Sequence, residues 1–308
     1  MQHASLILPP STRSTETPAA AVVLGAYLWA LRLLRGLTMS EVAAAIHCST
    51  SRMSRLETGH LCRPADALEL MEHYGVVDRQ SREAVDRLLQ EPPRQVLYDS
   101  APGWLDRLHA CQRRADSMVI HTACSLPDMV RIPEYSVGAL AQHLRADLLV
   151  RIPPRAALST VSGQDVTLLL DEMVLNRPVC QPSVMADQFA HLQKLGKSEM
   201  GPRILLVPLR AMVAPPPGLL YRMTVHGHEL IAEEWGTFVL YYTGKEAAKL
   251  WQHRLQTALA AAVSAKETVM CLGRARLEME AAECRQSRVG QMSCESRLFL
   301  APGGEAVL

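Results

Sequence analysis

In the first third of the chain, apolar residues recur every three or four positions, which is the spacing of a helix that buries one face. This spacing begins at Val22 and predicts a first helix that Gly36 closes. Four shorter helices follow, bounded by capping residues, prolines or glycines, and they are predicted to start at Thr38, Ser49, Pro64 and Ser81. Residues 22–92 are therefore predicted to form an all-α bundle of five helices.

Beyond Pro93 the helical spacing gives way to short apolar runs that are typical of strands. Strands are predicted at 118–123, 166–170, 204–209, 219–225, 229–232 and 237–242, and helices at 105–115, 135–144, 182–196 and 246–263. Because helices and strands do not alternate regularly, residues 98–275 are predicted to form an α+β domain with a largely antiparallel sheet. Residues 1–21 predict a flexible arm, and the polar residues 276–308 predict a frayed tail.

The chain of 308 residues is 48% hydrophobic, which is enough apolar material for the cores of two domains. Its 32 Lys and Arg residues nearly balance 31 Asp and Glu residues, so a surface for nucleic acid must be a local patch. No run approaches the ~18 apolar residues of a membrane span. The eight cysteines form no C-x-x-C pair and are predicted to be buried, reduced side chains. We therefore expect a cytoplasmic protein with no membrane association.

Residues 37–59 predict two short helices joined by a tight turn. Thr38 and Glu41 have the spacing of a capping box at the start of the first helix, and Ser49 caps the second. This arrangement is a helix-turn-helix, whose second helix enters the major groove of DNA with its N-terminal residues on base edges. The outward N-termini at Thr38 and Ser49 are expected to hold phosphates. The residues predicted to contact DNA are Thr38, Met39, Ser49, Thr50, Ser51, Arg52 and Arg55.

Residues 22–75 resemble the Xre/lambda-repressor-like helix-turn-helix family. The residues that carry the resemblance are Arg32, Leu37-Thr38, Glu41-Val42-Ala43, Ser49, Met53, Ser54, Glu57 and Gly59. The resemblance implies that Arg32 and Glu57 form a structural ion pair between the first and third helices. Breaking a semi-buried pair of this kind by removing one partner is expensive, on the order of 3–5 kcal/mol at the buried extreme.

The second domain carries further motifs at residues 125–135, 170–175, 184–192 and 204–208. In this order they resemble the actinobacterial antitoxin-like Xre regulators, the group that contains the WhiJ-type developmental regulators. The resemblance covers roughly residues 22–275. Asp128 and Arg131-Ile132 depart from the signature of the first motif.

No other motif predicts chemistry. Asp171 and Glu172 are neighbours at the end of a strand and point to opposite faces, which indicates a structural or interface role rather than a shared proton. The run from His226 to Glu229 lies at a predicted hairpin turn and matches no standard zinc spacing. The sequence therefore predicts no catalytic residue, no metal and no cofactor.

These observations predict a transcriptional regulator that binds double-stranded DNA as a homodimer on a (pseudo)palindromic site. The second domain is expected to dimerise, and the apolar helix from Leu250 to Ala262 is one candidate for that contact. The family resemblance implies a regulatory partner, such as a small protein encoded nearby. Two alternatives remain open: the second domain senses a small molecule, or it is an enzyme with a DNA-binding appendage.

Overall fold

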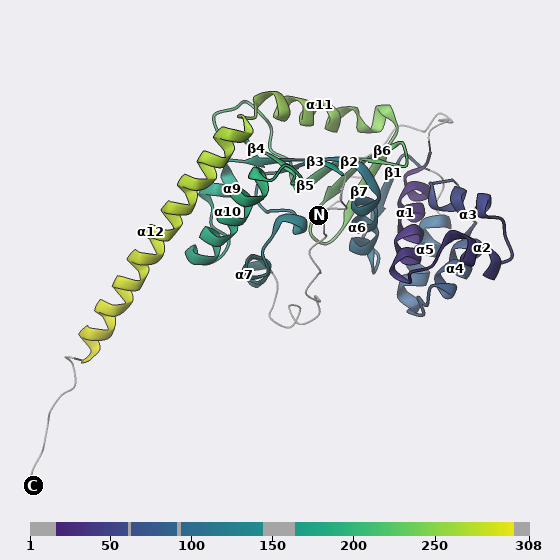
Figure 1. Cartoon of the computed structure of the whole chain (residues 1–308), viewed down its shortest axis with the longest axis horizontal. Helices are drawn as coiled ribbons and strands as arrows, with labels where there is room; N and C mark the ends of the chain where they lie inside the picture. Colours follow the sequence, from purple (N-terminus) through teal and green to yellow (C-terminus); the bar gives the residue numbers. More distant parts are fainter. Residues whose placement is uncertain (1–16, 61–62, 91–93, 144–163, 299–308) are drawn as a thin grey trace, which may run out of the picture. The chain divides into compact units, whose positions relative to one another are not determined.

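The computed structural model describes residues 17–60, 63–90, 94–143 and 164–298 (Figure 1). By internal contacts the chain divides into two compact units. The first comprises residues 1–121, 160–167 and 212–260, and the second comprises residues 122–159, 168–211 and 261–308. The predicted fold class is confirmed: a helical N-terminal region is followed by a domain with a largely antiparallel sheet and helices. Most of the predicted arm lies outside the described residues.

Five helices form the N-terminal bundle: α1 (Ala19–Leu34), α2 (Met39–Ala45), α3 (Thr50–Glu57), α4 (Pro64–His73) and α5 (Arg79–Gln90). Helix α1 is the central element, since it contacts α3, α4 and α5 as well as the sheet domain of the same unit. Its side chains are accordingly buried on almost all sides, and Val22, Leu24 and Leu28 are fully buried. Because α1 is apolar all round, it is the helix that holds the bundle together.

Helix α1 and the end of α3 approach each other closely at Gly25. A Cβ atom at this position would lie 2.8 Å from the backbone nitrogen of Gly59 and 2.9 Å from the carbonyl oxygen of Leu56. Both of these are backbone atoms, which cannot rotate away as the end of a side chain can. Gly25 therefore sets the distance between the central helix and the helix that we expect to enter the DNA groove.

We expect Gly25→Ala to lower the free energy of unfolding by about 1–3 kcal/mol, the usual range for overpacking a filled core. Gly36→Ala is the comparison. An added Cβ at Gly36 meets nothing within 4 Å, but φ there is +66°, so this variant shows the effect of backbone strain without a packing clash. Denaturant unfolding of the two variants measures the difference. A Gly25→Ala protein as stable as the wild type would show that α1 and α3 do not pack at this distance.

The sheet has seven strands: β1 (Val96–Asp99), β2 (Ala115–Thr122), β3 (Asp165–Asp171), β4 (Arg203–Val207), β5 (Leu219–Val225), β6 (His228–Glu234) and β7 (Val239–Thr243). Their order is β1-β7-β6-β5-β2-β3-β4. The pairs β1–β7, β7–β6, β6–β5 and β5–β2 are antiparallel. Strand β1 was not predicted, because it has only four residues and follows directly on the segment that ends the bundle.

In the first unit the sheet is covered on both faces. Helix α6 (Trp104–Arg114) contacts β5, β7 and α1, and Figure 1 shows α11 (Lys245–Ala261) along the opposite face. Trp251 of α11 packs on the ring of Tyr242, and Leu255 and Ala258 are buried with it. The helix from Leu250 to Ala262 was a candidate for the dimer contact, and this prediction is wrong for these three residues, because their side chains cover the chain's own sheet.

A fully buried ion pair links β1 to α6. Nε of Arg107 donates to Oδ2 of Asp99 over 2.7 Å, and Nη2 donates to Oδ1 over 2.8 Å. Nη2 also donates to the carbonyl oxygen of Ala101, and Nη1 donates to that of Pro102. Neither charged side chain is exposed to solvent. A buried pair that is hydrogen-bonded in this way is tolerated by the fold, but it is sensitive to the loss of either partner.

The second unit contains η1 (Asp128–Val130), α7 (Pro133–His143), α9 (Met173–Asn176), α10 (Pro182–Lys197) and α12 (Ala265–Leu298). The predicted frayed tail from residue 276 is wrong as far as Leu298, because α12 continues through it. A capping box between Ser264 and Glu267 starts this helix, and Thr268 and Leu272 are buried on one of its faces. Residues 299–308 lie outside the described residues.

Two further sequence expectations concern the whole described chain. Of the six cysteines described, only Cys111 is buried, whereas Cys124 and Cys284 are exposed, so the prediction of buried cysteines is wrong for most of them. A cysteine side chain is small enough to lie at the surface, and a single cysteine shows no periodicity from which its burial could be predicted.

In the described part of the chain no single helix is long and apolar enough to span a membrane. Helices α1 and α2 together have sufficient length and apolar composition, but the pair is bent by 99°.

Candidate nucleic-acid interface

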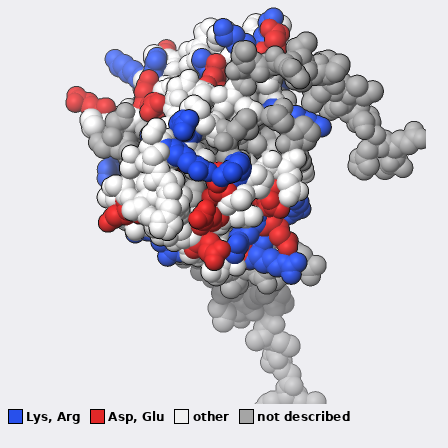
Figure 2. Space-filling model, turned by 90° about the vertical axis from the view of Figure 1, so that its right-hand side faces the viewer, with Lys and Arg blue, Asp and Glu red and all other residues white. Residues whose placement is uncertain are grey.

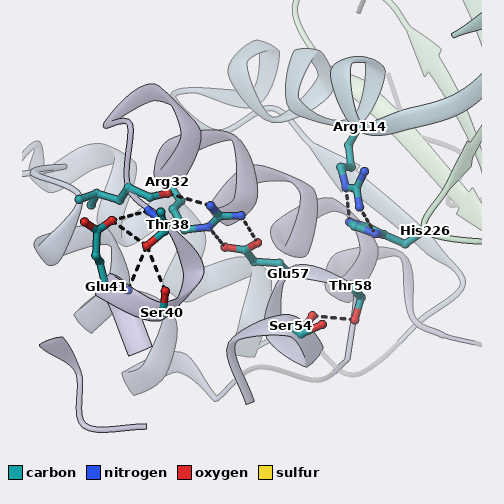
Figure 3. A network of polar contacts seen from close by, with 10 residues as sticks. Arg32, Thr38, Ser40, Glu41, Ser54, Glu57, Thr58, Arg114 and His226 are labelled. Atoms are coloured by element: carbon teal, nitrogen blue, oxygen red, sulfur yellow. Dashed lines mark hydrogen bonds and ion pairs between the residues drawn. The ribbon is translucent and has the colours of Figure 1, made fainter. Parts of the chain in front are cut away.

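Helices α2 and α3 form the predicted helix-turn-helix, and a side chain caps the N-terminus of each. Figure 3 shows the cap of α2 at Thr38 and Glu41. The capping box of α2 is complete: Oγ1 of Thr38 accepts from the backbone N–H of Glu41, and Oε2 of Glu41 accepts from the backbone N–H of Thr38. At α3, Oγ of Ser49 accepts from the backbone N–H of Arg52. The carboxylate of Glu41 puts a negative charge at the N-terminus of α2, which opposes the expected phosphate contact there.

The turn between α2 and α3 depends on His47, which adopts φ of +51°. The backbone N–H of Cys48 bonds to the carbonyl of Ala43, and that of His47 bonds to Ala44. These are the two hydrogen bonds of a Schellman motif, whose left-handed position normally holds glycine. This role of His47 was not predicted, because histidine is only a weak signal for a left-handed turn.

The residues predicted to contact DNA lie together at the start of α2 and along the first two turns of α3. Five of them are exposed, namely Thr38, Ser49, Thr50, Ser51 and Arg55, while Met39 and Arg52 are partly buried. A short polar helix that exposes its N-terminal half has the shape that base readout requires.

The two arginines of α3 differ in their contacts. Nη2 of Arg52 lies 2.8 Å from Oδ2 of Asp66 on α4, and the same carboxylate pairs with Arg63. The hydrogen bond from Arg63, reinforced by that from Arg52, lowers the pKa of Asp66. The side chain of Arg55 is exposed and has no hydrogen bond or ion pair in the described residues. Arg55 is therefore the arginine of α3 that is free to bind a ligand.

Residues 22–60 have a formal charge of +2 in the sequence, and contacts within the bundle engage three of their four arginines. Arg32 pairs with Glu57, Arg52 pairs with Asp66, and Arg35 donates to the carbonyl oxygens of Tyr74 and Gly75. On the face of the molecule shown in Figure 2, Lys and Arg side chains lie among Asp and Glu side chains. Attraction of DNA by this face therefore depends on a few side chains rather than on a broad basic field.

The ion pair expected between Arg32 and Glu57 is present, and it is buried and bidentate. Nε and Nη2 of Arg32 donate to the two carboxylate oxygens over 2.6 and 2.8 Å, and Nη1 donates to the carbonyl of Leu37. The hydrogen bond to Glu57 raises the pKa of Arg32. The third helix is thus fixed to the first, and the carbonyl of Leu37 ties the same arginine to the start of α2.

A second contact holds the same end of α3 against the sheet domain within the first unit. Arg114, at the end of α6, lies over the ring of Trp29 on α1, and its Nε donates to Nε2 of His226 over 2.8 Å. The ring of His226 also lies beside the backbone of Glu57. The bundle is therefore docked on the β5–β6 hairpin by a contact that the sequence did not predict.

His226 occupies the first position of the two-residue turn between β5 and β6. Both His226 and Gly227 have positive φ, of 51° and 76°, and Val225 pairs with His228, which is a type I′ hairpin. The predicted turn is confirmed. Burial, together with the charge of Arg114, lowers the pKa of the His226 ring from 6.5 to about 4. The ring is therefore neutral when it contacts α3.

We expect this histidine to make the protein less stable in mild acid. The unfolded chain takes up the proton below about pH 6.5, whereas the folded chain resists it down to about pH 4, so stability falls as the pH falls through that window. His226→Asn keeps the turn, since Asn-Gly is well suited to type I′, and removes the titrating ring. Denaturant unfolding across this window should show a shallower loss of stability for the variant. Parallel curves for the two proteins would contradict the assignment.

Asp171 and Glu172 do not act on each other. Oδ1 of Asp171 accepts from the backbone N–H of Met173, and Oε2 of Glu172 accepts from that of Leu209. Each carboxylate thus holds backbone, which agrees with the structural role favoured for them. His228 and Glu229 belong to β6, and Glu229 pairs with Arg222 of β5. In the part of the chain that is described, no group of three or more His, Cys, Asp or Glu residues could hold a metal ion.

The motif at residues 125–135 is built around two interactions. Nε2 and Oε1 of Gln188, a fully buried side chain of α10, bond to the carbonyl of Val130 and the N–H of Ile132. Asp128 and Arg131, the two charged departures from the signature, pair with each other over 2.7 Å. The charges of these two residues therefore neutralise each other, and the loop keeps its hydrogen bonds to Gln188 of α10.

Comparison with known proteins gives two matches. The family described as "Domain of unknown function (DUF5753)" matches residues 105–274, and "Helix-turn-helix domain" matches residues 23–85. The second match covers most of the bundle α1–α5, including both helices of the turn. The first begins in α6 and ends inside α12. No curated protein matches the chain.

Proposed function

Because the chain belongs to the family of the domain of unknown function DUF5753 and carries a DNA-binding helix-turn-helix domain, we propose that it is a sequence-specific transcriptional regulator. The observation that carries the proposal is the exposed N-terminal half of α3 with the unpaired Arg55. A guanidinium in this position matches the two acceptors that guanine presents in the major groove. The Arg32–Glu57 pair and the His226 contact hold this helix in a fixed orientation.

We also propose that the protein acts as a homodimer. One helix-turn-helix module buries a small surface and binds weakly by itself. Two modules bind tightly when their recognition helices lie about 34 Å apart, which is one turn of DNA. A homodimer would therefore bind a (pseudo)palindromic site.

Three more specific proposals rest on the sequence alone. The chain is an Xre-type, antitoxin-like regulator of the actinobacterial group, and it is cytoplasmic. Its second domain binds a regulatory partner that is encoded nearby. Two of the motifs that carry this resemblance are in contact, because Gln188 in residues 184–192 bonds to the backbone of residues 125–135. Native mass spectrometry of the protein purified from its own host tests the partner: a bound small protein supports it, and a bound small molecule supports the sensor alternative.

Selection from a pool of random DNA duplexes tests the main proposal. The full-length protein should enrich an inverted repeat with half-sites one helical turn apart. A pool that stays random after repeated rounds at fixed salt would show binding through phosphates only, and the proposal of sequence-specific recognition would fail.

We expect Arg55→Ala to weaken binding of the enriched site by about 5–150-fold, which corresponds to the 1–3 kcal/mol of a bidentate contact with guanine. Arg52→Ala should have a smaller effect, because Arg52 is already paired with Asp66. Arg79→Ala, a change of an exposed arginine on α5, is the matched control. Fluorescence anisotropy with the enriched and a random duplex measures both affinities. Equal losses on the two duplexes would mean that Arg55 touches phosphate and not bases.

A further inference from the structure

Helix α12 carries an exposed apolar stripe. Met270 and Leu277 are 62% and 58% exposed, and Ala281 and Cys284 are exposed as well. These residues are separated by seven, four and three positions, so they lie along one face of the helix. The side chains of α12 that pack inside the second unit, such as Thr268, lie on another face.

The length of α12 makes this stripe significant. The helix has 34 residues and is therefore about 51 Å long. Its first part packs on α10 and β4, and Figure 1 shows the remainder running on beyond α10. The stripe lies on the part of α12 that packs along α10, but on a face whose side chains stay exposed. A partner on this face would remove the apolar side chains of the stripe from water.

Charged residues on one side of the stripe indicate what the partner is. Glu267, Arg274, Glu278 and Arg285 are all exposed and lie within about 40° of one another around the helix axis. Arg274 and Glu278 have no ion pair in the described part of the chain. In an antiparallel pair of identical helices, a residue of one copy faces the residue of the other copy that lies equally far beyond the twofold axis, when both lie on the same side of the interface. Arg274 and Glu278 are each two positions from residue 276, and Glu267 and Arg285 are each nine positions from it. A twofold axis at residue 276 therefore brings the members of both pairs face to face.

We propose that two copies of this chain pair antiparallel through α12, with the twofold axis at residue 276. Arg274 of each copy then faces Glu278 of the other, and Glu267 faces Arg285, so opposite charges meet in a single register. Leu277 lies next to the axis and contacts its own equivalent, while Met270 packs near Ala281 of the second copy. This inference rests on the proposed homodimer and identifies the surface that forms it.

Sedimentation of the full-length protein over a range of concentrations tests the interface. We expect the wild type to be a dimer, and Leu277→Glu to weaken dimerisation at least about tenfold, because two carboxylates would meet beside the axis. The control is Leu250→Glu, a change of a leucine on α11 that is 56% exposed, which should leave the dimer intact. Circular dichroism of each variant shows whether the helices persist.

Charge reversal tests the register. Arg274→Glu should weaken the dimer, because a like charge then faces Glu278 of the second copy. Combining it with Glu278→Arg should restore the dimer, which no general effect on folding would do. If the combined variant stays as weak as the single one, the proposed register is wrong.

The outcomes separate the two proposals. A wild-type protein that is monomeric at every concentration removes the homodimer and this interface with it. In that case the stripe would be left for a different protein. A wild-type dimer that neither Leu277→Glu nor Arg274→Glu weakens overturns the α12 interface alone and leaves the homodimer standing.

Discussion

Asp99→Ala is expected to lower the free energy of unfolding by about 3–5 kcal/mol. The change leaves the guanidinium of Arg107 without the two hydrogen bonds it makes to the carboxylate, in a place that solvent does not reach. Two neighbouring carbonyls would still accept from Arg107, but neither neutralises its charge. Unfolding in urea, followed by circular dichroism, measures the loss.

Two controls test whether the effect comes from the unpaired charge. The double change Asp99→Leu with Arg107→Met removes both charges and should recover much of the stability, because no ion is then buried alone. Arg222→Ala breaks an ion pair that is about 40% exposed, and it should change stability by about 1 kcal/mol or less. An Asp99→Ala protein that unfolds at the same urea concentration as the wild type would mean that water reaches Arg107.

Arg32→Ala is expected to have the second large effect, also about 3–5 kcal/mol if the site stays dry. Glu57 is 2% exposed and would lose its partner, and α2 would lose the contact between Arg32 and the carbonyl of Leu37. Because Arg32 points into the bundle, DNA affinity measured well below the melting temperature should fall much less than with Arg55→Ala.

Thermal melting together with DNA titration separates the two roles of Arg32. Arg79→Ala breaks an exposed pair on α5 and should leave both the melting temperature and the affinity unchanged. A melting temperature for Arg32→Ala equal to that of the wild type would contradict the structural role. A loss of affinity as large as that of Arg55→Ala in a protein that is still folded would indicate direct contact with DNA.

The sequence predicted the elements whose signals are local. Strand β5 has the predicted bounds, because its alternating apolar residues end at a two-residue turn. The capping box at Thr38 forms as its spacing indicates. Helix α12 was not predicted, and its part after residue 276 was taken for a frayed tail, because a helix that is polar on most sides resembles an unstructured tail. The hydrogen-bonded cap at Ser264 was its only local sign.

The candidate site was predicted in outline, and its contacts were not. Arg52 and Arg55 have the same local sequence signal, yet only the fold places Asp66 beside Arg52. The contacts of Gly25 with α3 and of His226 with Glu57 join segments far apart in the chain, so no short motif reveals them. Residue type and spacing thus indicated a DNA-binding surface, and tertiary packing decides which side chains remain free to use it.

The central claim is that α3 recognises a DNA sequence. The most direct test is a titration of the full-length protein with its enriched duplex and with a random duplex of equal length, at one fixed salt concentration. We expect the wild type to prefer the enriched duplex at least about 1,000-fold, the lower end for specific DNA-binding proteins, and Arg55→Ala to show a much smaller preference. Equal affinities of the wild type for the two duplexes would contradict it.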